Sequence, residues 1–208
     1  MIAKLDLSSL NNKFRNSDAD DIIQFAINLA ERPLVTTSFG AHSAAILYGT
    51  TRLNKNIQVV WCDTLFNTEA TYKHAEVLIS MLQLNIEIFR PMGEVLGANL
   101  LSEKKEIQDF DANEFARKIK LEPFNRAIHK YKPDVWFTTI RKNQSSYRNT
   151  LNVFSLTSDG ILRVSPFYHY TDDEIRYYLT KNELPMEYDY FDPVKSSSKS
   201  ECGIQIRS

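Results

Sequence analysis

Short apolar runs alternate with amphipathic segments along most of this chain. Four runs are rich in β-branched or aromatic residues, as is typical of strands buried in a parallel sheet: residues 34–37, 57–62, 86–89 and 134–140. Apolar residues at helical spacing predict helices over 17–29, from Ala41 onward, over 68–82 and from Pro123. This alternation predicts an α/β fold with a doubly wound, mainly parallel sheet and helices on both faces.

Two segments interrupt this alternation. Residues 92–119 are rich in charge, and we expect a helical, partly exposed insertion there. The run Ser196–Ser200 is serine-rich and predicts a flexible, hydrophilic linker. We therefore expect one α/β domain over residues 1–194 and a flexible C-terminal tail over 195–208.

Composition narrows the classes of protein to which the chain can belong. With 208 residues and 43% hydrophobic content, it can bury the core of a single domain. The formal net charge of −1 argues against a surface that coats nucleic acid. We find neither a run of transmembrane length nor the pattern of a signal peptide, and expect a cytoplasmic protein without a membrane partner.

The first strand runs into a small-residue loop, Ser38–Ser43, and then into a helix. Such a loop presents backbone N–H groups and the positive end of a helix dipole, which suits a phosphate or sulfate group. It has a single glycine and no Lys-Ser/Thr ending, so it is neither a dinucleotide fingerprint nor a Walker loop. By itself the loop leaves anion binding and a plain structural turn as equal alternatives.

Polar residues also follow two other predicted strands. Asp63 and Thr64 follow the strand 57–62, either at the ligand-binding edge of the sheet or as a turn cap. Residues 141–148 follow the strand 134–140 and hold three cations and five neutral hydrogen-bonding side chains. Because guanidinium groups grip phosphate and sulfate oxygens, this loop favours an anion clamp over a solvated basic loop.

The two cysteines, Cys62 and Cys202, are too few for a disulfide framework or a four-thiolate metal site. Cys62 lies in an apolar strand and is interpreted as a small core side chain. Cys202 lies in a polar segment near cationic residues, which favour its thiolate, so it is a candidate reactive thiol. The four histidines show no metal-ligand spacing, and we expect no metal site.

Several separated motifs together resemble the phosphoadenylyl-sulfate (PAPS) reductase and adenylyl-sulfate (APS) reductase family, over roughly residues 33 to 204. The most specific combination is the loop Arg-Lys-x-Gln-Ser-x-x-Arg at 141–148 with the terminal Glu-Cys-Gly at 201–203. The other matching segments are Ser38–Ser43, Asp63-Thr64 with Thr71-Tyr72, Glu122-Pro123 before Arg126-Ala127, and Pro166 followed by Thr171-Asp172.

The resemblance implies an adenine nucleotide hydrolase-like, PP-loop-related fold that reduces PAPS to sulfite and adenosine 3',5'-bisphosphate, a step of sulfate assimilation. It makes Cys202 the nucleophile that forms an S-sulfocysteine, with reduced thioredoxin or glutaredoxin as electron donor. It also implies a homodimer. The substrate-binding residues that it implies are Ser38, Phe39, Gly40, Ala41, His42, Ser43, Asp63, Thr64, Arg141, Lys142, Gln144, Ser145 and Arg148.

Members with an iron–sulfur cluster need two cysteine pairs, which this chain lacks, so we expect no bound cofactor. That favours PAPS as substrate, although cluster-free APS reductases share these features. The chain departs from the family at Leu65 and Thr139, where glycines are usual, at Gln205, where a histidine is usual, and in a shortened segment between Tyr188 and Glu201. Two other hypotheses are an ATP-pyrophosphatase-type adenylating enzyme and a non-catalytic nucleotide-binding module.

Overall fold

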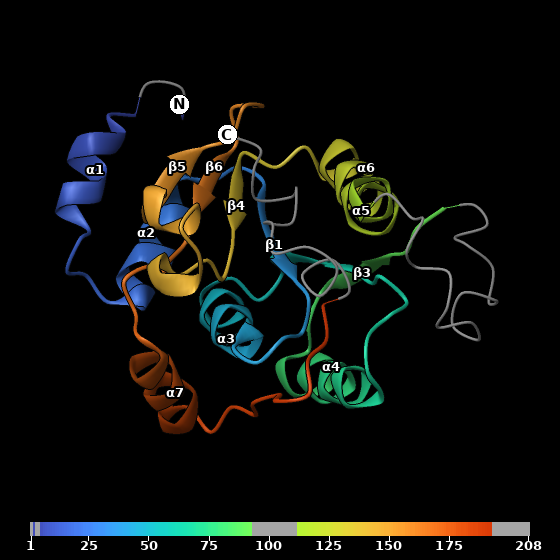
Figure 1. Ribbon diagram of the computed structural model, residues 1–208. Helices are drawn as coiled ribbons and strands as arrows, with labels where there is room; N and C mark the ends of the chain where they lie inside the picture. Colours follow the sequence, from blue (N-terminus) through green and yellow to red (C-terminus); the bar gives the residue numbers. More distant parts are fainter. Residues whose placement is uncertain (1, 3–4, 93–111, 193–208) are drawn as a thin grey trace.

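A six-stranded sheet forms the centre of the computed structural model, which describes residues 2, 5–92 and 112–192 (Figure 1). Its order is β3-β2-β1-β4-β6-β5, and every neighbouring pair is parallel except β5 with β6. The strands are β1 (Pro33–Thr37), β2 (Gln58–Cys62), β3 (Ile86–Phe89), β4 (Val135–Phe137), β5 (Phe154–Leu156) and β6 (Leu162–Val164). The predicted, mainly parallel sheet is confirmed.

The chain builds β1, β2 and β3 outward in one direction and then returns to place β4 on the other side of β1. The connections after β1 and β4 therefore diverge at the carboxyl edge of the sheet. Ligands of open α/β sheets bind in the crevice at such a switch point.

Seven α-helices are found among the described residues. They are α1 (Leu7–Lys13), α2 (Ala19–Leu29), α3 (Ser43–Leu53), α4 (Glu69–Leu82), α5 (Ala112–Ala116), α6 (Glu122–Tyr131) and α7 (Asp172–Lys181). A π-helical turn, η4 (Arg117–Leu121), joins α5 to α6, and two 3-10 turns, η5 (Lys142–Gln144) and η6 (Arg148–Thr150), follow β4. The helices predicted over 17–29 and 68–82 are confirmed, and Pro123 lies in the first turn of α6 as expected.

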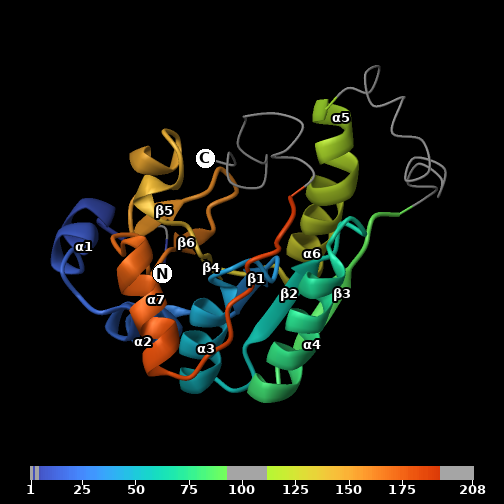
Figure 2. The same ribbon diagram turned by 60° about the horizontal axis from the view of Figure 1, so that its bottom comes forward.

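Helices cover both faces of the sheet, as predicted (Figures 1 and 2). Neighbouring residues of β1 show the division. Leu34 packs in the cluster that contains Phe124 of α6, whereas Val35 packs in the larger cluster formed with α2, α3, α4 and α7. Such two-sided burial explains why the strands read as continuous apolar runs instead of alternating ones.

The periodicity did not predict α1, α7, β5 or β6. Both strands have only three residues, so no period is visible in either. At the edge of the sheet, Asn11 of α1 pairs with the main chain of Phe154 through two hydrogen bonds, of 2.9 and 2.8 Å.

No helix in the described part of the chain is long and apolar enough to cross a membrane. The predicted boundary at residue 194/195 and Cys202 lie outside the described residues.

Candidate anion-binding pocket

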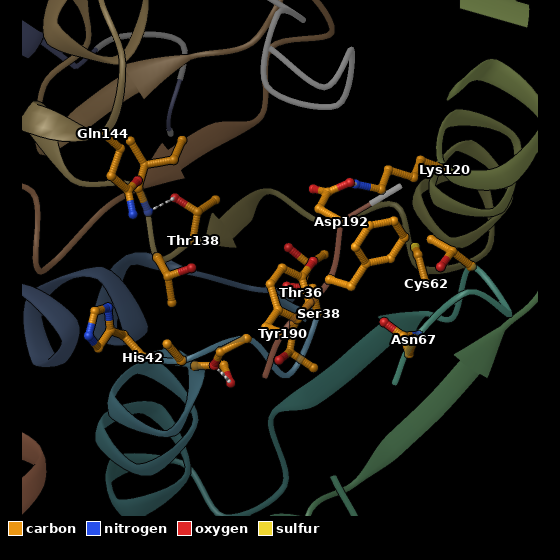
Figure 3. Close-up of a pocket in the computed structure, with 18 of the residues that line it drawn as sticks. Thr36, Ser38, His42, Cys62, Asn67, Lys120, Thr138, Gln144, Tyr190 and Asp192 are labelled. Carbon is orange, nitrogen blue, oxygen red and sulfur yellow. Dashed lines mark hydrogen bonds and ion pairs between the residues drawn. The ribbon is translucent and has the colours of Figure 1, made fainter. Parts of the chain in front are cut away.

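A cavity of about 290 Å³ opens at the carboxyl ends of β1, β2 and β4, at the switch point of the sheet (Figure 3). Residues from five separate segments line it. They are Thr36, Thr37, Ser38, Gly40, Ala41, His42, Ser43, Cys62, Thr64, Asn67, Lys120, Phe124, Thr138, Thr139, Ile140, Gln144, Arg148, Tyr190, Phe191 and Asp192. Two of the loops singled out in the sequence, 38–43 and 141–148, therefore meet at one pocket.

The loop after β1 turns sharply at Phe39, whose φ of 51° lies in the left-handed region. Its ring is fully buried and packs edge-on against Trp61, with centroids 4.8 Å apart. Phe39 thus anchors the loop from beneath, and its side chain does not line the pocket.

The other loop residues bring the start of α3 to the cavity. The Ser43 N–H and hydroxyl both donate to the Gly40 carbonyl oxygen, at 2.9 and 2.7 Å. Ser38, Ala41 and His42 line the pocket beside them. The N-terminus of a helix at a polar cavity suits an anionic group, because the positive end of the helix dipole lies there.

Asp63 lies at the end of β2 with its side chain fully buried, and it is not among the residues that line the pocket. Its Oδ1 accepts hydrogen bonds from the Leu65 N–H, Asn67 Nδ2 and Tyr72 hydroxyl, at 2.9 to 3.0 Å. Its Oδ2 accepts one from Arg90 Nε at 3.0 Å. The carboxylate thus ties down the loop that carries the pocket residues Thr64 and Asn67.

The orientation of Asn67 follows from Asp63. Because a carboxylate only accepts hydrogen bonds, the amide nitrogen of Asn67 faces Asp63, which leaves its oxygen free to turn toward the pocket (Figure 3). The sequence reasoning missed Asn67, since no periodic or motif signal distinguishes it from a loop asparagine.

The side chains of the basic loop after β4 face different surroundings. Arg148 and Gln144 line the pocket, and the Arg148 guanidinium donates to the Gln144 amide oxygen. Arg141 instead forms an ion pair with Asp172 at 2.6 Å and donates to His42 Nδ1 at 3.3 Å. Lys142 and Ser145 do not line the pocket.

His42 is held in its neutral form by this arrangement. Burial lowers the pKa of His42 below its ordinary value of 6.5, and the positive charge of Arg141 lowers it further. Because Nδ1 accepts from Arg141, the remaining proton of the neutral ring lies on Nε2. The hydrogen bond and charge of Arg141 also lower the pKa of Asp172.

Lys120 of η4 enters the pocket from the opposite side of the sheet and forms an ion pair with Asp192. The sequence places Lys120 just past the charged segment that we interpreted as an insertion. No pattern there distinguishes Lys120 from Lys118, which pairs with Glu114 on the surface at 2.8 Å. Only the burial of Lys120, whose side chain is 10% exposed, identifies it as a pocket residue.

Cys62 was interpreted as a small core side chain, and its position in the structure is only partly that of a core residue. It is half-buried and packs against the cluster around Phe124, but it also lines the pocket. The last residue of a strand at the carboxyl edge can do both, because one side of it meets the core and its end meets the crevice.

The chain is similar to known proteins over most of its length. The model of the phosphoadenosine phosphosulfate reductase domain family matches residues 32–192. A phosphoadenosine 5'-phosphosulfate reductase from Xylella fastidiosa is 30% identical over 182 residues, which cover 86% of this chain and 76% of that protein. One from Synechocystis sp. is 30% identical over 187 residues, covering 88% of this chain and 75% of that protein.

Solved structures show the same fold. The PAPS reductase of Candida auris, in a phosphate complex, has a TM-score of 0.74 at 21% identity and covers 86% of this chain and 87% of that chain. The U34-tRNA thiolase of Methanococcus maripaludis has a TM-score of 0.56 at 14% identity, covering 86% and 68%. These neighbours confirm the expected PP-loop-like fold.

Proposed function

This chain belongs to the phosphoadenosine phosphosulfate reductase domain family, and we propose that it reduces PAPS to sulfite and adenosine 3',5'-bisphosphate. The observation that carries the proposal is the pocket at the switch point, where a helix N-terminus and two cations face one cavity. A sulfonucleotide carries several anionic groups, and this pocket offers donors for more than one of them.

We assign the anionic groups of the substrate to the cationic side chains and to the start of α3. Arg148, Gln144 and the loop 38–43 line one part of the cavity, and Lys120 enters from α6's side. Arg141 contacts His42 and Asp172, so it acts through His42 and the loop geometry. Asp63 likewise acts by holding Thr64 and Asn67 at the cavity.

Cys202 supplies the reactive sulfur in this proposal. Its thiolate attacks the sulfate sulfur, a sulfur–sulfur bond forms, the sulfur–oxygen bond to the nucleotide breaks, and adenosine 3',5'-bisphosphate leaves. Sulfate oxygens repel a thiolate unless nearby cations offset their charge, which Arg148 and Lys120 provide. Cys202 follows the pocket residue Asp192 by ten positions, a length that can span at most about 35 Å.

Reduced thioredoxin or glutaredoxin completes the reaction. A thiolate of the donor attacks the Cys202 sulfur of the S-sulfocysteine, and sulfite leaves with the electron pair of the broken bond. The second donor thiol then attacks the mixed disulfide, which restores Cys202 and leaves the donor oxidised. We place this reaction in the cytoplasm, in a homodimer whose subunits comprise a domain at 1–194 and a tail at 195–208.

The test is sulfite release from PAPS, and from APS in parallel, with reduced thioredoxin. We expect Cys202→Ser to abolish sulfite release while adenosine 3',5'-bisphosphate still binds. Cys62→Ser is the matched control, because it alters the other thiol of the chain, which lines the pocket, and should leave sulfite release in place. Without thioredoxin, wild-type protein should gain the mass of one SO₃ group on the peptide that contains Cys202.

Two results would contradict the proposal. Sulfite release by Cys202→Ser at the wild-type rate would remove the proposed nucleophile. ATP turnover with release of pyrophosphate, and no sulfite from either sulfonucleotide, would favour an adenylating enzyme instead.

A further inference from the structure

A short segment crosses the mouth of the pocket after α7. We call residues 187–192 the strap. Two contacts hold its first half against the start of α4: the Thr71 hydroxyl donates to the Glu187 carboxylate at 2.9 Å, and the Thr68 hydroxyl donates to the Asp189 carbonyl oxygen at 2.9 Å. The strap therefore has a defined path over the carboxyl edge of the sheet.

The second half of the strap occupies the pocket itself. The Tyr190 ring lies close against the loop 38–43. A Cβ added at Gly40 would be 3.3 Å from Tyr190 Cδ1. Tyr190, Phe191 and Asp192 all line the cavity, and Figure 3 shows Tyr190 near its centre and Asp192 reaching Lys120. The remaining space, about 290 Å³, is at the lower end for a ligand pocket.

The strap brings a negative charge to the cations of the pocket. Among the described residues that line the pocket, the lysine and arginine side chains are those of Lys120 and Arg148, and the only carboxylate is that of Asp192. The side chains of Lys120 and Asp192 are 10% and 9% exposed, so their attraction is only weakly screened by water. An anionic ligand that pairs with Lys120 must displace a carboxylate of the protein.

We propose that Asp192 is a built-in competitor that holds the strap over the empty pocket by occupying Lys120 until a sulfonucleotide anion replaces it. The inference rests on the proposed function for the identity of that anion. A nucleotide must break the Lys120–Asp192 pair before it binds. The strap therefore makes the free energy of nucleotide binding less favourable by the free energy that stabilises its closed position.

The strap also connects this exchange to the reactive end of the chain. Asp192 is followed in sequence by the segment that contains Cys202. An exchange at Lys120 therefore acts on the chain ten positions before the proposed nucleophile.

The experiment measures the affinity of the full chain for adenosine 3',5'-bisphosphate by titration calorimetry. We expect Asp192→Asn to bind at least about fivefold more tightly than wild type, a typical size for such a coupling. Asp189→Asn is the matched control, because it removes one negative charge from the same strap at an exposed position outside the pocket. We expect its affinity to match that of wild type.

A second set of variants tests whether Lys120 is the shared partner. Lys120→Gln should weaken binding, and Asp192→Asn should then bring no further gain, because the cation that pairs with Asp192 has been removed. Asp192→Ala, with folding checked by circular dichroism, repeats the test with a different side chain.

The outcomes separate the strap from the proposed function. Unchanged or weaker binding by both Asp192 variants, while wild type binds the nucleotide, would overturn the competitor alone. The same gain from Asp192→Asn with and without Lys120 would also overturn it, since the gain would then be a general charge effect. If no variant binds the nucleotide, both proposals fail.

Discussion

Asp63 shows how far a motif leaves the role of a residue open. A carboxylate at the end of a parallel strand was expected either to border the ligand or to cap a turn. The structure places Asp63 fully inside the protein with four hydrogen-bond donors around it. Its neighbours Thr64 and Asn67, which it positions, are the ones that line the pocket.

We predict that Asp63→Asn lowers the free energy of unfolding by about 2–4 kcal/mol, because an amide NH₂ would face buried donors that need an acceptor. Urea denaturation measures the change. Asp173→Asn is the control: Asp173 is 93% exposed and pairs with Arg176 at 3.2 Å, so its loss should cost less than about 0.5 kcal/mol. Equal losses in the two variants would contradict the buried role of Asp63.

Cys62 and Lys120 show the limits of reasoning from single residues. An apolar neighbourhood in sequence suggested a core thiol at Cys62, and no pattern distinguished Lys120, which follows the charged segment 92–119. Both side chains line the pocket. Burial depends on which elements pack together, and that information is absent from the few residues on either side.

The helices α2, α3, α4 and α6 and the strands β1 to β4 were predictable, because their apolar residues recur at helical spacing or lie in continuous apolar runs. The helix α4 begins at Glu69, after Thr68 accepts a hydrogen bond from the Thr71 N–H at 3.1 Å, as the capping pattern indicates. By contrast, β5 and β6 pair as an antiparallel edge of three residues each, which no pattern in the sequence revealed. Their pairing depends on their contacts with β4 and α1, which lie far away in the sequence.

The helix α1 protects that edge, and its contribution is testable. Asn11 both donates to the Phe154 carbonyl oxygen and accepts from the Phe154 N–H, as a paired strand would. We predict that Asn11→Ala costs about 1–3 kcal/mol, because two backbone groups of β5 lose their partner. The neighbouring Asn12 is exposed, so Asn12→Ala is the matched control and should change little. Chemical denaturation compares the two, and similar curves would contradict the role of Asn11.

At the scale of the whole molecule, three histidines make stability depend on pH. Burial is the main cause that lowers the pKa values of His42, His74 and His169 below 6.5. Below pH 6.5 the unfolded chain therefore takes up more protons than the folded one, so the free energy of unfolding falls as the pH drops.

The prediction is a progressive loss of stability between pH 7.5 and pH 5.5, measured as the urea midpoint at constant ionic strength. Replacement of His74, a buried residue outside the pocket, by Asn should reduce the slope. The carboxylates with lowered pKa values, such as Asp172 and Glu87, contribute only at lower pH. A stability that stays constant or rises over this interval would contradict the effect of the histidines.

The sequence by itself determined the class of fold, the strands β1 to β4 and the helices α2, α3, α4 and α6, because the pattern of apolar residues within one segment is a local property. It also determined the family, because the motifs at 38–43, 63–64 and 141–148 occur in a fixed order. Only the tertiary structure decided which of those side chains reach the cavity, that Phe39, Asp63 and Arg141 turn inward, and that Lys120 meets Asp192. The physical reason is that burial and pairing arise between segments far apart in the chain, so each residue's partners are set by packing.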